Sequence, residues 1–222
     1  YRQLVPVVLP DWTPDAPLQP LGFDWSVAAG IELAVLRLDL IDPLISGNKW
    51  FKLTHHLQAA AAAGAEGLIS LGGAHSNHLH ALAAAGRRFG FATVGLLRGE
   101  PQDTPTVRDL QALGMQLHWL GYGGYRARHE AGFWQPGQAR YPGWYCIPDG
   151  GGGLAGAQGC GLIVAQARAQ GVHIGQQVAR AAFLAGFDQA DDAWVRRVLA
   201  FQRLDGGNAG VNGIAIVCAA PA

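Results

Sequence analysis

Lysine is nearly absent from this sequence. Lys49 and Lys52 are its only two lysines, and all its other strongly basic side chains are arginines. Arginine replaces lysine well as a surface cation, but its pKa is too high for it to act as a neutral amine. Two lysines kept three residues apart therefore indicate a task that needs an amine, and the leading such task is a Schiff base with a carbonyl cofactor. The alternative is a pair of surface lysines in a composition that favours arginine.

Charge and cysteine are scarce as well. Charged residues make up 14% of the 222 residues, and 16 basic side chains balance 16 acidic ones, so the formal net charge is zero. The sequence has neither the basic stripe of a nucleic-acid-binding protein nor the polybasic run of a membrane-surface protein. The three cysteines are odd in number and lack a CxxC spacing, which predicts neither a disulfide framework nor a zinc site.

Long apolar runs are also missing. No run reaches the ~18 residues that a membrane span needs, and the N-terminus lacks the basic-then-apolar layout of a signal peptide. We therefore expect a cytoplasmic protein, with no membrane and no nucleic-acid partner. Low charge and a hydrophobic fraction of 50% favour a compact enzyme or an oligomer over a disordered partner.

Strand-like and helix-like segments alternate along most of the chain, with short connections. This alternation predicts parallel βαβ units. The expected strands are 31–40, 67–71, 91–97, 115–120, 144–147 and 213–218. The expected helices are 48–63, a helix that Ser76 or Asn77 caps and that runs to 89, 106–113, and most of 175–201.

Three short segments carry candidate chemistry. In the first, Asn48 is expected to cap a helix whose first turn contains Lys49. The unpaired backbone N–H groups there, and the positive end of the helix dipole, disfavour an ammonium group and lower its pKa. A neutral amine is then easier to reach.

The second segment runs from Gly72 to His78, at a strand-to-helix turn. Backbone N–H groups converge at such a turn and readily bind a carboxylate or a phosphate. Ser76, Asn77 and His78 add side-chain donors. The alternative is an ordinary helix cap followed by a solvated histidine.

The third segment is the run of four glycines that follows Asp149. Such a run is costly in conformational entropy unless the backbone bends sharply or contacts a ligand. The alternative is a flexible loop.

A metal site is a further alternative, because His75, His78 and His80 are close in sequence. These positions do not share one helix face, and no carboxylate lies beside them to complete a site. We therefore expect no metal.

The order and spacing of these blocks resemble a known family. Ser46-Gly47-Asn48-Lys49, followed by Gly72-Gly73-x-x-Ser76-Asn77-His78, is similar to the family of 1-aminocyclopropane-1-carboxylate deaminase and D-cysteine desulfhydrase. Arg108-Asp109-Leu110 and Ile147-Pro148-Asp149-Gly150-Gly151 continue the resemblance, which covers roughly residues 20–160. These proteins are pyridoxal-phosphate enzymes of the tryptophan-synthase-β fold type.

The resemblance implies roles for four residues. Lys49 would form the internal aldimine with pyridoxal phosphate and later move protons, and Ser76 is the second candidate catalytic residue. Asn77 would hydrogen-bond the ring hydroxyl of the cofactor. Ser76, Asn77 and His78 together would receive the carboxylate of the substrate.

The resemblance also implies an α/β fold of two domains, each with a parallel twisted sheet flanked by helices, and a cofactor cleft between them. The larger domain would comprise residues 1–51 and 149–222, and residues 52–148 would form a smaller inserted domain. A homodimer is expected.

The implied function is a pyridoxal-phosphate-dependent deaminase or desulfhydrase, a lyase-type enzyme acting on a small amino acid such as 1-aminocyclopropane-1-carboxylate or D-cysteine. The alternatives are a synthase or racemase of the same fold type, or a non-catalytic ligand-binding relative.

The last third of the chain departs from the family pattern. The family has a Thr/Ser/Gly loop for the cofactor phosphate, and no such loop follows residue 160. The glycine-rich segment 206–210 is the nearest to it but lacks hydroxyl groups. We therefore expect a chain break between Cys160 and Gly213, with the phosphate loop in or beside it. The alternative is that the segment with this loop is truly deleted.

Overall fold

The computed structural model describes residues 12–22, 24–28, 32–171 and 214–219. These residues fall into two compact units. One contains 12–13 and 49–160, and the other contains 14–48 together with the described residues from 161 onward. The division into 1–51 with 149–222 and an inserted 52–148 stays a prediction.

The first unit contains a four-stranded parallel sheet. Its strands are β3 (Gly67–Gly72), β4 (Ala92–Leu97), β5 (Gln116–Trp119) and β6 (Tyr145–Cys146), in the order β5-β4-β3-β6. All six residues of β3 are buried, as expected for a central strand of a parallel sheet with both faces covered. The βαβ pattern read from the sequence is confirmed here.

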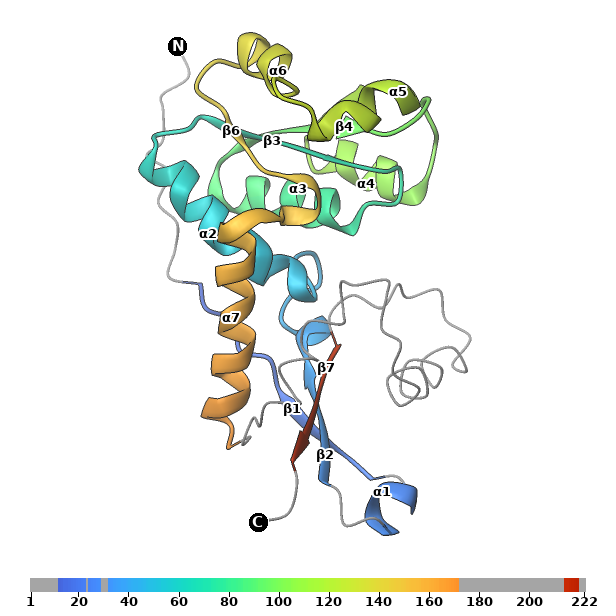
Figure 1. The fold of residues 1–222 in the computed structure, drawn as a ribbon, viewed down its shortest axis with the longest axis vertical. Coiled ribbons are helices and arrows are strands. Elements are labelled where there is room, and N and C mark those ends of the chain that lie inside the picture. Colours follow the sequence, from blue (N-terminus) through green and yellow to red (C-terminus); the bar gives the residue numbers. More distant parts are fainter. Residues whose placement is uncertain (1–11, 23, 29–31, 172–213, 220–222) are drawn as a thin grey trace. The chain divides into compact units, whose positions relative to one another are not determined.

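Helices lie on both faces of this sheet (Figure 1). Helix α3 (Asn77–Phe89) joins β3 to β4, and α4 (Pro105–Ala112) joins β4 to β5, so the chain moves across the sheet in one direction. The return to β6 at the opposite edge passes through α5 (Gly121–Arg126), η2 (Ala127–His129) and α6 (Gln135–Arg140). Right-handed crossovers that run in opposite directions along a sheet lie on opposite faces, which explains the two layers.

Helix α2 (Asn48–Ala62) precedes β3, and after β6 the short η3 (Asp149–Gly151) leads into α7 (Gly153–Ala169). Helix α7 contacts α2 backbone to backbone. A Cβ atom added at Gly159 would collide with the carbonyl oxygen of Phe51, and one added at Gly156 would collide with that of Gly151. The core of this unit is formed by Phe51, Leu53, Leu57, Leu68, Ile69, Leu71, Leu79, Leu82, Val94, Leu97, Leu110 and Ile147.

The second unit contains a three-stranded sheet in the order β1-β2-β7. Its elements are β1 (Leu18–Leu21), α1 (Asp24–Ala28), β2 (Glu32–Arg37), η1 (Leu38–Leu40) and β7 (Ile214–Ala219). Both strand pairs are antiparallel, whereas parallel sheets were expected in both domains. The connection between β1 and β2 explains the first pair, because it is shorter than the dozen or more residues of a parallel crossover.

The α/β class, with a parallel sheet flanked by helices, is confirmed. The expected strands and helices between residues 31 and 147 are found with shifts of a few residues at their ends. The expected helix over 175–201 lies outside the described residues. Of the segment where a chain break is expected, residues 160–169 continue α7 without interruption, and residues 172–213 lie outside the described part.

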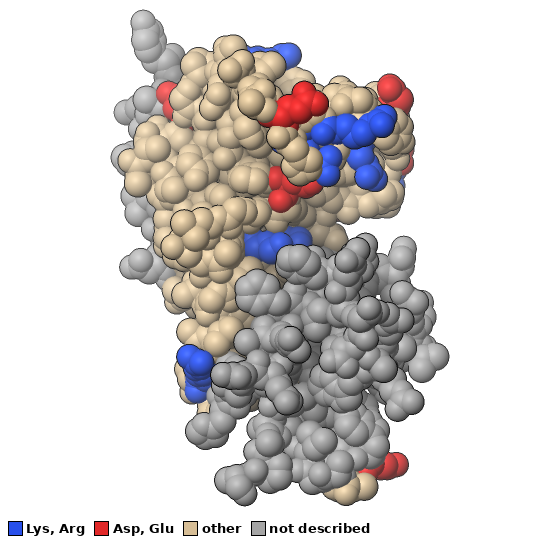
Figure 2. Space-filling model, in the orientation of Figure 1, with Lys and Arg blue, Asp and Glu red and all other residues tan. Residues whose placement is uncertain are grey.

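On the face shown in Figure 2, one larger group of lysine or arginine side chains has acidic side chains beside it. Smaller basic patches on this face are separated from that group by uncharged surface. No helix among the described residues is long and apolar enough to cross a membrane.

Candidate functional site

Lys49 lies at the start of α2 and is partly buried. Burial and, next, the neighbouring Lys52 ammonium lower the pKa of its amine from 10.5 to about 8, against a smaller opposing effect of the Cys160 thiolate. The direction is the one expected from the sequence, but the main cause is burial. Asn48 does not cap the helix as expected, because it is itself helical and its buried Oδ1 has no hydrogen-bond partner among the described residues.

The turn between β3 and α3 is built as the sequence predicts. Ser76 is the N-cap of α3, and its Oγ accepts a hydrogen bond from the Leu79 N–H at 3.2 Å. The Ser76 N–H donates to the Gly73 carbonyl oxygen at 3.0 Å, which closes the turn. Asn77, the first residue of the helix, is exposed. The first-turn N–H groups of α3 point out of the helix start, where an anion can bind.

His78 lies one residue further along α3 but faces the interior, and only 3% of it is exposed. Its Nε2 is 2.8 Å from Ser70 Oγ, and the Ser70 hydroxyl donates to the Ile147 carbonyl oxygen at 2.9 Å. Since that hydroxyl has a single proton, Ser70 must accept from His78, so Nε2 carries the imidazole proton and Nδ1 is a bare acceptor. Nδ1 is buried without a partner among the described residues.

The imidazole of His78 is neutral. Burial and, next, the charges of Lys49, Lys52 and His56 lower its pKa from 6.5 to about 3. The side chain of His78 is therefore not an exposed donor beside Ser76 and Asn77. Its Nδ1 is a buried hydrogen-bond acceptor, and the positive charges of Lys49 and Lys52 are close enough to lower the pKa of the ring.

The glycine run approaches these residues closely. Gly151 has a φ of 70°, a conformation that favours glycine. A Cβ atom added there would lie 3.2 Å from Lys52 Cβ and 3.3 Å from His78 Cε1. On the next residue, the Gly152 carbonyl oxygen accepts from His56 Nε2 at 3.0 Å. The structure therefore brings all three segments singled out in the sequence into one neighbourhood.

Ser76 and Asn77 are not joined to that neighbourhood directly. No hydrogen bond or ion pair between described residues links either of them to Lys49 or Lys52. In the part of the chain that the structure describes, Ser76 and Asn77 are linked to the two lysines and the glycine run only through the chain, because Asn77 immediately precedes His78 in α3.

A polar cluster at Asp149 was not predicted. The Tyr125 hydroxyl donates to Asp149 Oδ2 at 3.1 Å, and Arg128 Nε lies 3.4 Å from the same oxygen. Burial and, next, the Asp149 carboxylate raise the pKa of Tyr125 to about 12. No sequence pattern marks Tyr125, Ser70 or His56, because their partners are distant in sequence.

The histidines considered for a metal do not converge. His75 is exposed, His78 faces Ser70, and His80 Nε2 lies 3.7 Å from Asp109 Oδ2. Among the described residues, no three His, Cys, Asp or Glu side chains are grouped closely enough to hold a metal ion.

The curated proteins that resemble this chain in sequence include two with different names. One, from Pyrococcus abyssi, is named as a 1-aminocyclopropane-1-carboxylate deaminase and is 39% identical over 71 residues, which are 32% of this chain and 22% of that protein. The other, from rice, is named as a mitochondrial D-cysteine desulfhydrase and is 39% identical over 79 residues, 36% of this chain and 19% of that protein. No family model matches the chain.

A solved structure named as an ACC deaminase homologue shares the fold, with a TM-score of 0.60 and 26% sequence identity. The match covers 74% of this chain and 50% of the solved chain, so this chain spans about half the length of that relative. Over the matched segments, the chain is therefore similar in sequence to proteins named as a 1-aminocyclopropane-1-carboxylate deaminase and a D-cysteine desulfhydrase, and its fold is similar to that of an ACC deaminase homologue.

Proposed function

We propose that this chain holds pyridoxal phosphate at Lys49 and acts as a deaminase or desulfhydrase on a small amino acid. One observation carries the proposal: the lysine that follows Gly47-Asn48 is partly buried, and its pKa is lowered to about 8. An amine with this pKa is neutral in a substantial fraction of molecules near pH 7 to 8, and only a neutral amine attacks an aldehyde.

The residues around Lys49 fit the aldehyde and ring end of this cofactor. Asn48 Oδ1 and His78 Nδ1 are buried acceptors without partners among the described residues, and such atoms are costly unless something binds them. The side chain of Asn77 is exposed at the start of α3, so its amide is accessible to the ring hydroxyl of the cofactor. For the phosphate end, the described residues offer no loop rich in serine and threonine.

Each residue then has a defined task. Lys49 is the residue that would hold the cofactor and would later move a proton at Nζ, and the cofactor would supply the electron sink for bond cleavage. Ser76 and Asn77 receive the substrate carboxylate at the N-terminus of α3. His78 contributes to carboxylate binding through its backbone N–H, because its side-chain N–H is already donated to Ser70.

The names of two curated relatives support this substrate class, because one refers to 1-aminocyclopropane-1-carboxylate and the other to D-cysteine. Both are small amino acids with a free carboxylate, as the proposed turn requires. A synthase or racemase reaction would use the same lysine and the same turn.

Borohydride trapping tests the central assignment. After incubation with pyridoxal phosphate and reduction, peptide mass spectrometry should find the pyridoxyl group on Lys49 in the wild type and in Lys52→Gln, and nowhere in Lys49→Ala. Lys52→Gln is the matched control, because it removes the other lysine of the chain. An adduct that persists in Lys49→Ala at Lys52 would refute the assignment, and no adduct in the wild type would favour a non-catalytic relative.

A further inference from the structure

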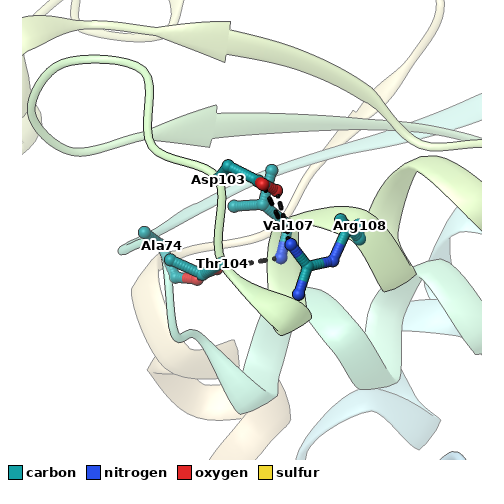
Figure 3. A network of polar contacts seen from close by, with 5 residues as sticks. All are labelled: Ala74, Asp103, Thr104, Val107 and Arg108. Carbon is teal, nitrogen blue, oxygen red and sulfur yellow. Dashed lines mark hydrogen bonds and ion pairs between the residues drawn. The ribbon is translucent and has the colours of Figure 1, made fainter.

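Thr104 makes two hydrogen bonds with a single hydroxyl group (Figure 3). It is the N-cap of α4, and its Oγ1 accepts from the Val107 N–H at 3.1 Å. The same hydroxyl donates its proton to the carbonyl oxygen of Ala74 at 2.6 Å. Only 8% of Thr104 is exposed, so water does not compete strongly for either bond. A side chain that caps its own helix thus also binds a segment 30 residues earlier in the chain.

Ala74 lies in the middle of the turn that presents Ser76 and Asn77. The turn is closed by the hydrogen bond from the Ser76 N–H to the Gly73 carbonyl oxygen, and Ala74 itself is 6% exposed. Binding the Ala74 carbonyl fixes the peptide plane between residues 74 and 75. The orientation of that plane sets where the chain enters α3, and therefore where the first-turn N–H groups point.

We propose that Thr104 is a positioning residue that holds the turn Gly73–Asn77 in its anion-binding conformation. This inference rests on the proposed function, in which Ser76 and Asn77 receive the carboxylate of the amino acid. A binding group works well only when its supporting residues hold it within about 0.5 Å of the productive geometry. A turn held in place before the ligand arrives also loses less conformational entropy on binding.

Three variants separate the hydroxyl group from its surroundings. Thr104→Val keeps the shape of the side chain and removes both hydrogen bonds, whereas Thr104→Ser keeps the hydroxyl. Asp103→Asn is the matched control, because Asp103 precedes Thr104 and pairs with Arg108 at 2.9 Å in an exposed contact. Exposed ion pairs contribute little, so this change should leave the turn as it is.

The first measurement is hydrogen exchange of peptides that cover residues 73–79, with peptides of α4 followed in parallel. We expect faster exchange at 73–79 in Thr104→Val, and wild-type exchange in Thr104→Ser and Asp103→Asn. The second is a spectral titration of the pyridoxal-phosphate-loaded protein with 1-aminocyclopropane-1-carboxylate and with D-cysteine. Of the two bonds lost in Thr104→Val, the one to Ala74 supports the turn, and its loss should weaken amino-acid binding about tenfold, with borohydride trapping at Lys49 unchanged.

The results distinguish this inference from the proposed function. Wild-type exchange at 73–79 in Thr104→Val, or failure of Thr104→Ser to restore it, would overturn the role of Thr104. Equal effects of Thr104→Val and Asp103→Asn on exchange at 73–79 would also overturn this role. Wild-type amino-acid affinity in Thr104→Val would overturn it as well. If the wild type gives no adduct at Lys49, or neither amino acid changes its spectrum, the proposed function fails and the carboxylate role of the turn fails with it.

Discussion

At the scale of single residues, the two lysines offer an unusual experimental advantage. Since the chain has no other lysine, the spectroscopic signals of these two side-chain amines do not overlap with those of further lysines. Their proximity also means that each charge acts on the other. Burial is the larger influence on the Lys49 amine, and Lys52 adds to it.

Titration of the lysines should show this directly. After reductive methylation with labelled formaldehyde, we expect the Lys49 methyl resonance to titrate near pH 8, well below the ordinary 10.5. Replacing Lys52 with Gln removes a like charge, which favours the ammonium form, so the midpoint for Lys49 should rise. A Lys49 midpoint near 10.5 in the wild type would show that the amine is not desolvated. An unchanged Lys49 midpoint in Lys52→Gln would show that the Lys52 charge does not lower the pKa of Lys49.

The buried imidazole of His78 should make the fold sensitive to acid. Its pKa is about 3 in the folded protein and near 6.5 in the unfolded chain, and Lys49, Lys52 and His56 oppose its charging. Above pH 6.5 neither state is protonated there. As pH falls from 6.5 toward 3, only the unfolded state gains the proton, so the free energy of unfolding decreases.

Urea denaturation at several pH values measures this dependence. In His78→Gln, which cannot titrate but can still donate to Ser70, the free energy of unfolding should fall less steeply between pH 6.5 and 4 than in the wild type. The carboxylates and His56 are present in both proteins, so the difference reports His78. Parallel curves would mean that His78 titrates normally.

At the scale of elements, the contact between α2 and α7 depends on the missing side chain of Gly159. Helix interiors normally disfavour glycine, because alanine is more stable there by about 0.5–1 kcal/mol. Helix α7 nevertheless has Gly156 and Gly159 on its buried side, where a Cβ atom would meet backbone carbonyl oxygens. Gly161, two residues on, has open space around its Cα atom.

This contrast gives a matched pair of substitutions. Gly159→Ala should destabilise the protein by about 1–3 kcal/mol, because a methyl group forces α7 away from Phe51. Gly161→Ala should stabilise it by about 0.5–1 kcal/mol, because it only removes flexibility from the unfolded chain. Urea midpoints of the two variants measure the difference, and equal changes of the same sign would contradict the described helix contact.

The elements that the sequence predicts are those with local signals. Ser76 caps α3 and Gly90 ends it, and both are readable because the cap residue and the left-handed glycine act on their own helix. Helix α7 was missed because its glycines resemble a loop, and packing against α2 overrides their low helix propensity. In the site, Lys49 and the glycine run were found from composition. Ser70 and Thr104 were not, because they bond carbonyl groups 77 and 30 residues away.

At the scale of the whole molecule, serine and threonine residues are distributed very unevenly along the chain. From residue 107 to the end, the chain contains neither serine nor threonine. A phosphate dianion is held best by several N–H donors together with hydroxyls at a helix start. A phosphate site in this part of the chain would lack serine and threonine hydroxyls.

The affinity for the cofactor should therefore depend only weakly on its phosphate. We expect pyridoxal and pyridoxal phosphate to bind this chain with dissociation constants within about tenfold of each other, the equivalent of about one hydrogen bond. Parallel absorbance titrations of the wild type measure both, and Lys49→Ala provides the baseline without an adduct. A preference for the phosphate form of a hundredfold or more would reveal a phosphate site that the sequence does not mark.

The close crossing of α7 over α2 also affects how mutational scans of this protein should be interpreted. Positions 156 and 159 will tolerate few substitutions, and in such a scan they will resemble residues that bind a ligand. They lie close in sequence to the glycine run, which strengthens that impression. At position 159 the intolerance would report the proximity of the α2 backbone, and at position 156 that of the Gly151 carbonyl in η3. Loss of function at these positions should therefore be assigned to chemistry only in variants shown to remain folded.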